Sequence, residues 1–238
     1  MKKIIFNKNS KNHVEVFTNH KFLYDMEETR PKPASNYLPY WWKDMPRKIN
    51  TIDGSLVGTA KSCPSFAQMF SQGIVIPMWT DVIFTRKGKH FTWKTPDKTF
   101  QWEFHPEEQF ISYLNLPDNQ SVYKSICPWF IKTNKNVSVY QFPMFFNFNT
   151  DYSVMPGIIN TDHHWTINQQ MIYTSKEDTF TIKRGEPFAW YVPFERSKFD
   201  FNVKVADEKR KMELQDQLGA VFTKFFGHYA GEAKKRGV

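Results

Sequence analysis

The sequence predicts a mainly β protein, a single sandwich or barrel that ends in an amphipathic helix. The chain of 238 residues holds 23 Phe, 10 Tyr and 8 Trp, and aromatic side chains favour pleated, half-buried sheets. Apolar residues alternate with polar ones in many short segments, separated by Gly, Pro and Asn turns. Only the end of the chain changes to the apolar spacing of a helix.

Residues 1–50 are expected to form N-terminal strands and an aromatic connector. Short apolar runs at 4–6 and 14–17 predict two strands. Two prolines in 30–33 exclude a helix there, because proline restricts itself and the residue before it. The Tyr- and Trp-rich segment 37–43 favours a buried plug over one end of the fold, or an exposed stacking platform for bases or sugars.

Residues 60–206 are expected to form the β core. Gly73 and Gly185 each lie between an apolar segment and a strand-like run, so we expect left-handed turns at both. Helices are expected at 64–72 and 106–114. The expected strands are 74–78, 81–84, 90–93, 100–104, 129–132, 137–142, 158–159, 167–173, 179–182, 188–192 and 199–205.

Residues 207–232 are expected to form the C-terminal helix, with Asp207 as its N-cap. One face of this helix collects Leu214, Leu218, Val221, Phe222 and Phe225. We expect this face to dock on the sheet as core, and an oligomer contact is the second interpretation. Because the sequence shows neither repeats nor low-complexity tracts, a single domain spanning 1–238 is expected.

Charge and cysteine usage limit which partners and which compartment the sequence favours. The net charge is +8, but the basic residues form only short clusters, so a nucleic-acid partner is not indicated beyond this mild charge. Cys63 and Cys127 belong to no CxxC pair, which favours two buried thiols in a reducing cytoplasm. No apolar run has the length of a membrane span or the form of a signal peptide.

One polar cluster stands out, at Asp162, His163 and His164. A carboxylate beside histidines invites comparison with the facial iron site of double-stranded β-helix oxygenases. The order lacks the usual spacer, and neighbouring side chains on a strand point to opposite faces, so no metal ligand is assigned. We expect Asp162 and one histidine to bind a ligand at the mouth of a concave site, next to Arg196 or Asp81.

A plainer interpretation of the same cluster is that Asp162 caps a turn and that both histidines are solvated. The sequence contains neither a nucleophile motif such as GxSxG nor a Gly-rich phosphate loop. No cofactor and no catalytic residue is therefore indicated, and whether the protein is an enzyme is left open.

Residues 157–162 and 183–189 resemble the third motif and the following strands of trimeric dUTPases. The resemblance implies a β-clip-like fold. It departs from the family where chemistry matters. His163 stands at the place of the base-contacting Tyr, Glu186-Pro187 replaces Asp-Arg, and the Arg-Gly-Glu motif and the Gly-rich C-terminal arm are missing. The resemblance therefore implies the fold more than it implies dUTP hydrolysis.

A second resemblance covers 33–46, 60–64, 73–81 and 157–196, which are similar to an uncharacterised family of tailed-phage and bacterial proteins. It implies a phage source, and hence the host cytoplasm or the virion, but no activity. The function expected is a non-catalytic virion-associated or protein-binding component, with a virion or host protein as partner and a homo-oligomer left open. The alternatives are a metal-dependent oxygenase or cupin-like enzyme, and a dUTPase-like nucleotide-binding protein.

Overall fold

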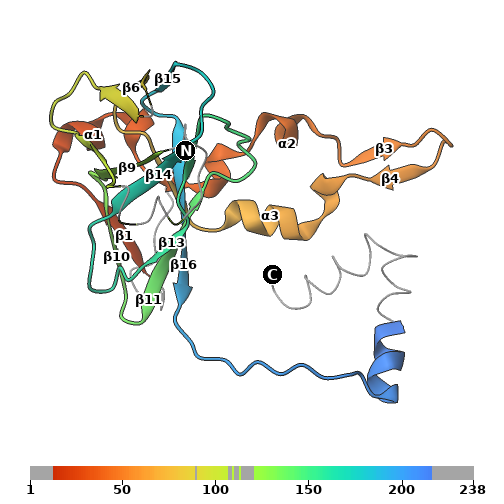
Figure 1. Ribbon diagram of the computed structural model, residues 1–238. Helices are drawn as coiled ribbons and strands as arrows, with labels where there is room; N and C mark the ends of the chain where they lie inside the picture. The colour runs from red at the N-terminus through yellow and green to blue at the C-terminus, as the bar shows by residue number, and fades with distance from the viewer. Residues whose placement is uncertain (1–12, 89, 107–108, 110–112, 114–120, 216–238) are drawn as a thin grey trace. The chain divides into compact units, whose positions relative to one another are not determined.

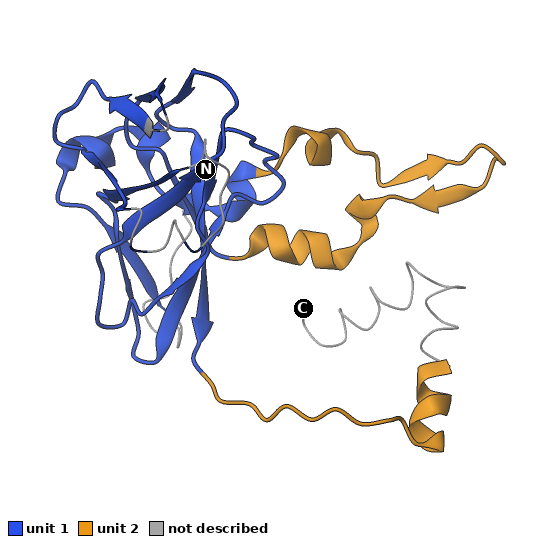
Figure 2. Ribbon diagram, viewed as in Figure 1, with its two compact units in different colours: residues 1–37, 73–196 blue, residues 38–72, 197–238 orange. Residues whose placement is uncertain are grey.

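The computed structural model describes residues 13–88, 90–106, 109, 113 and 121–215 (Figure 1). The protein is mainly β with several antiparallel sheets, as predicted. It divides into two compact units (Figure 2). Unit 1 comprises residues 1–37 and 73–196, and unit 2 comprises 38–72 and 197–238. The single domain expected from the sequence stays a prediction.

The described residues of unit 1 form four sheets, in which all the pairings are antiparallel. The five-stranded sheet has the order β13-β11-β16-β5-β2, the second is β12-β14-β9-β8, the third is β15-β6-β7, and β1 pairs with β10. The strands are β1 (Val14–Phe17), β2 (Lys32–Pro33), β5 (Ile74–Pro77), β6 (Val82–Lys87), β7 (His90–Lys94), β8 (Trp102–Phe104), β9 (Ser121–Ile126), β10 (Phe130–Thr133), β11 (Val137–Pro143), β12 (Tyr152–Val154), β13 (Gly157–Ile159), β14 (Asn168–Tyr173), β15 (Thr179–Ile182) and β16 (Pro187–Glu195). Helix α1 (Lys21–Asp25) and 3-10 turns at Glu27–Thr29 and Ala34–Tyr37 lie among them.

Residues with a left-handed backbone conformation form turns between these strands. Gly73 (φ 72°) and Gly185 (φ 84°) both have positive φ, which confirms the expectation from sequence. At Gly73 the reason is also steric, since a Cβ there would lie 2.0 Å from the carbonyl oxygen of Tyr191 in β16. Asn136 (φ 68°) closes the turn between β10 and β11, a conformation that Asn tolerates better than most residues.

An aromatic core fills unit 1 and accounts for the unusual composition. Buried residues from the five-, four- and three-stranded sheets belong to one continuous cluster. Within it, the rings of Trp79 and Trp102 stack at 6.2 Å, and Phe84 meets Trp102 edge-on at 5.6 Å. Such offset and edge-to-face contacts stabilise beyond simple burial. The sheets are therefore held by ring packing on their inner faces.

A buried polar contact ties two of these sheets together. Tyr191 of β16 is buried, and its hydroxyl lies 2.5 Å from Gln169 Oε1 of β14 and 3.2 Å from Gln141 Oε1 of β11. Burial raises the pKa of Tyr191 well above its ordinary value, so the hydroxyl keeps its proton. Satisfied buried polar groups of this kind fix one arrangement of a core.

Unit 2 contains its own small cluster. Residues 38–72 form α2 (Tyr40–Asp44), the hairpin β3 (Lys48–Asn50) and β4 (Leu56–Gly58), a 3-10 turn (Ala60–Ser62) and α3 (Pro64–Ser71). Trp42 is buried and packs on Phe70 at 4.7 Å and Phe66 at 5.7 Å, whereas Tyr40 is exposed. The aromatic segment thus anchors α2 on α3 through Trp42.

One expectation from sequence is wrong. Residues 199–205 are extended but pair with no strand in the described part of the chain, because alternation predicts a conformation and an apolar face without naming a partner.

The expected C-terminal helix begins as predicted, but its docking is untested. Residues 208–215 are helical, and the backbone N–H of Arg210 donates to Asp207 Oδ1 at 2.9 Å, which makes Asp207 the N-cap. Leu214 is 45 % exposed. The other members of the expected apolar face, and the expected strand at 4–6, lie outside the described residues, as does most of 106–114.

Candidate functional site

The structure places Arg196 against Asp162. Arg196 follows β16 and Asp162 follows β13, two strands on either side of β11. Arg196 Nη1 donates to Asp162 Oδ1 at 3.1 Å, and Nη2 donates to Oδ2. The Asp162 side chain is only 8 % exposed. This is the bidentate geometry that makes an Arg–carboxylate pair both strong and directional.

Three further residues close a network around this pair. The N–H of Asn136 donates to Asp162 Oδ2 at 3.0 Å. Arg196 Nη1 also donates to Ser138 Oγ at 2.9 Å and to Asn160 Oδ1 at 3.1 Å. The backbones of Asn136 and Arg196 are joined as well, since the N–H of Arg196 donates to the Asn136 carbonyl at 2.9 Å. The network therefore fastens the β10–β11 turn, the start of β11 and the chain after β16 to the segment after β13.

These donors fix the charge of Asp162. The hydrogen bond from Arg196 is the largest cause that holds the pKa of Asp162 far below its ordinary value, and the N–H of Asn136 and the ring of His163 act in the same direction. Asp162 is therefore ionised across the physiological range, with much of its hydrogen-bonding capacity used inside the protein.

The two histidines belong to the turn that follows β13. The N–H groups of His163 and His164 both donate to the carbonyl of Asn160, at 3.2 and 3.0 Å. His163 Nδ1 lies 2.9 Å from Asp162 Oδ1 with the rest of its ring in solvent, and His164 is exposed. Among the residues described here, no three His, Cys, Asp or Glu side chains gather as a metal site requires. The ligand geometry therefore lends the facial iron site no support.

Asp81, the remaining expected site residue, lies elsewhere in unit 1. Its Oδ1 accepts a hydrogen bond from the N–H of Arg184 at 2.8 Å, next to the Gly185 turn. It borders a hollow of about 430 Å³. The lining mixes charged and apolar side chains: Phe22, Met26, Trp79, Thr80, Asp81, Pro96, Asp97, Lys98, Phe100 and Arg184. This volume lies within the range of small-molecule sites, and ligand binding at Asp81 stays a prediction.

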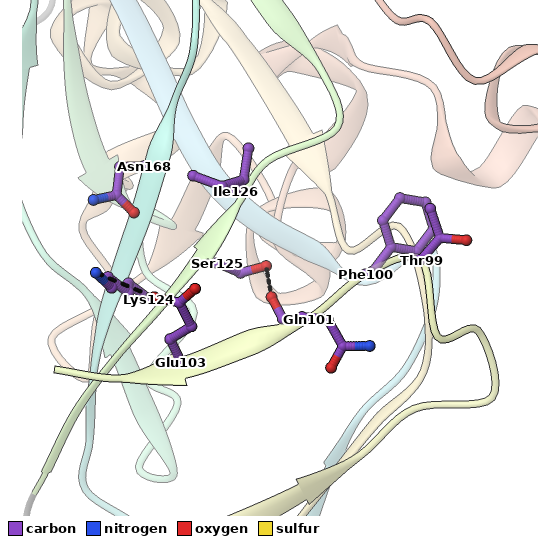
Figure 3. Close-up of a pocket in the computed structure, with 8 residues that line it drawn as sticks. All are labelled: Thr99, Phe100, Gln101, Glu103, Lys124, Ser125, Ile126 and Asn168. Carbon is purple, nitrogen blue, oxygen red and sulfur yellow. Dashed lines mark hydrogen bonds and ion pairs between the residues drawn. The ribbon is translucent and has the colours of Figure 1, made fainter.

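A second hollow, of about 210 Å³, lies over β8, β9 and the start of β14 (Figure 3). Its polar groups already contact one another: Lys124 Nζ lies 3.2 Å from Glu103 Oε2, and Ser125 Oγ donates to the Gln101 carbonyl at 2.7 Å. The volume is below that of most ligand sites. Asp162, His163, His164 and Arg196 line neither of these two hollows, and ligand binding by these four residues stays a prediction.

An exposed apolar segment, which we call the arm, spans residues 197–206. Phe199, Phe201, Val203 and Val205 alternate with polar residues, so they share one side of the extended chain, and each is between 79 % and 94 % exposed. Sequence reasoning found this alternation but assigned it to the core. The signal that it is a separate surface is its place after the network at Arg196, where the described sheet ends.

The β3–β4 hairpin carries a smaller set of exposed apolar side chains. Ile49, Ile52, Leu56 and Val57 are all exposed, and Ile52 lies in the turn itself. The N–H of Ser55 donates to Asp53 Oδ1 at 3.1 Å, and Gly54 has a φ of 83°, so the turn is well formed. An ordered turn that presents Ile to solvent is suited to contact with another molecule.

Comparisons with known proteins give no family. No family model and no curated protein matches the sequence. Among solved structures, the dUTPase from phage phi11 of S. aureus is similar, with a TM-score of 0.35 and 8 % identity over 82 % of this chain and 98 % of that chain. A similarity of this size carries no argument about fold or activity. None of the helices in the described part of the chain is long and apolar enough to span a membrane.

Proposed function

We propose that the protein is a non-catalytic component of a larger assembly, such as a virion, and that it works by binding a protein chain through its arm. The observation that carries the proposal is the row of four exposed apolar side chains at 199–205. Full burial of one such side chain contributes about 1.5 to 3 kcal/mol. A partner that covers the row therefore gains far more than contact with scattered surface residues would give.

The backbone of the arm supports the same proposal. Residues 199–205 are extended and carry no strand pairing to any described residue, so their N–H and C=O groups are open to a partner. An exposed apolar strand is a liability for aggregation unless something covers it. Strand addition satisfies both needs, since main-chain hydrogen bonds give affinity and alternate side chains give specificity.

The polar cluster supports the non-catalytic part of the proposal. Asp162 and Arg196 neutralise each other and join four segments of the fold. Such a pair acts as a structural tie, and a catalytic carboxylate instead needs an open position for substrate. The exposed β3–β4 hairpin offers a second contact surface, in agreement with a component that touches more than one neighbour.

Site-specific photo-crosslinking in the producing cells tests this function. A benzophenone amino acid is placed at Phe201, whose side chain belongs to the apolar row, and as a matched control at Ile83, an exposed apolar residue on paired strand β6. We expect protein–protein adducts from position 201 and few from position 83. Position 201 yielding no protein adduct, or the same adducts as position 83, would overturn the proposal.

A further inference from the structure

The arm is self-complementary about Asn202. Residues 199–205 read Phe-Asp-Phe-Asn-Val-Lys-Val. If two copies of this segment run antiparallel with Asn202 opposite Asn202, each Asp200 faces a Lys204 of the other copy. The same register places aromatic rings opposite β-branched side chains, which pair well across strands.

Charge selects this register over the others that keep the apolar side chains together. A parallel in-register pair puts Asp200 opposite Asp200 and Lys204 opposite Lys204. An antiparallel pair centred on Phe201 puts Lys198 opposite Lys204, and one centred on Asp200 again opposes two aspartates. Like charges directly opposite each other destabilise a sheet, whereas opposite charges stabilise it. Among these registers, the one centred on Asn202 joins the two oppositely charged pairs without a like-charge clash.

We propose that the partner of the arm is the arm of a second copy of this chain, paired antiparallel about Asn202 to make a twofold-symmetric dimer. This inference rests on the proposed function, because it names the chain that the arm binds. A twofold axis requires that each residue meet its symmetric counterpart, so the contact made by Asp200 of one copy is repeated by Asp200 of the other. The single central Asn satisfies that requirement by facing its own copy.

A two-stranded ribbon needs cover on its apolar face to be stable in water. The helix that begins after Asp207 supplies an apolar side chain directly beyond the arm, since Leu214 is 45 % exposed. In the proposed dimer the Leu214 side chains of both copies pack on the apolar face, while Asp200, Asn202 and Lys204 face solvent on the other side of the ribbon.

Charge exchange tests the pairing. The full chain, of 28.3 kDa, is expected to sediment at equilibrium as a dimer. Asp200→Lys and Lys204→Asp each create two like-charge contacts across the axis, so each should weaken the dimer about tenfold. The double variant Asp200→Lys/Lys204→Asp restores both pairs and the original net charge, and should recover the wild-type dissociation constant. Because all three variants change exposed residues, the thermal midpoint of each monomer serves as the control for folding.

A disulfide tests the register itself. In a Cys63→Ser background, Asn202→Cys places two thiols directly opposite, at a Cα separation of about 4.5 to 5.5 Å that a disulfide spans. The matched control Asp200→Cys separates its two thiols by four residues along the ribbon, about 13 Å. We expect rapid oxidation to a covalent dimer for Asn202→Cys and little for Asp200→Cys.

Each result has one meaning. A monomer at all concentrations up to about 100 µM, a dimer insensitive to both charge exchanges, or equal oxidation of the two Cys variants would overturn the second copy as partner. Photo-crosslinks from Phe201 to a different protein would also overturn it, while leaving the proposed protein-binding function standing. Both ideas fail together if position 201 crosslinks to no protein, or if it gives the same adducts as position 83.

Discussion

Replacing Gly73 with Ala should disrupt unit 1 more than any other Gly-to-Ala change at a described turn. Gly73 precedes β5 with a φ of 72°, and its carbonyl accepts the N–H of Ala34 at 3.1 Å. A Cβ at this position would lie 2.0 Å from the carbonyl oxygen of Tyr191, in the centre of β16. Because that oxygen is backbone, neither strand yields without loss of the β5–β16 pairing.

The magnitude has two parts. A left-handed conformation costs an L-residue about 1 to 2 kcal/mol, and overpacking adds about 1 to 3 kcal/mol. Gly73→Ala should therefore cost about 2 to 5 kcal/mol. Gly88→Ala is the matched control in the same unit, since Gly88 has a φ of 63° with nothing within 4 Å of the added Cβ. It should cost about 1 kcal/mol, because Ala also lowers the entropy of the unfolded chain.

Urea unfolding followed by tryptophan fluorescence measures both variants, because Trp79 and Trp102 lie in the core of unit 1. The midpoint should fall clearly further for Gly73→Ala than for Gly88→Ala at an unchanged slope. If the two variants lose the same free energy of unfolding, that result would contradict the close approach of Gly73 to the Tyr191 carbonyl oxygen.

Three further predictions concern single groups. The pKa of Asp162 is lower in the folded than in the unfolded protein, so its contribution to stability is present above about pH 4 and is lost as the pH falls. Asp162→Asn should therefore be less stable than the wild type at pH 7 and should lose less stability than the wild type toward pH 2 in acid titrations. A loss of stability parallel to that of the wild type would contradict this. Tyr191→Phe leaves buried glutamine oxygens without their donor and should cost about 1 to 3 kcal/mol in urea unfolding, whereas an unchanged midpoint would refute the buried contact. Burial raises the pKa of Cys127 to about 12, so a thiol reagent at pH 8 should modify Cys63 alone in the native protein and both thiols in urea, and two fast native thiols would disprove the burial.

Much of the strand pattern could be predicted from the sequence because local rules govern it. The strand at 179–182 was predicted to the residue, and both Gly73 and Gly185 hold the left-handed turns that their flanking segments require. Pairing between distant strands was harder. The insertion of β11 between β16 and β13 depends on contacts that no local pattern encodes.

The candidate site shows the same division. The proximity of Arg196 to Asp162 was expected, yet the neighbours that bind both groups, Asn136, Ser138 and Asn160, carry no distinctive pattern in the sequence. The arm is the opposite case, since its alternation was plain. Periodicity reports which face of a strand is apolar, but it does not report whether the same chain or another one covers that face.

Amide hydrogen exchange across residues 198–206 tests the central claim most directly, because it reads the backbone hydrogen bonds of the arm. If the arm adds as a strand to another chain, its amides are protected in the assembled state and exchange at nearly the unprotected rate in the dilute monomer. β16, which is paired on both sides, serves as the internal reference and should stay protected in both states. Arm amides that exchange at the unprotected rate in the assembled protein would contradict the account.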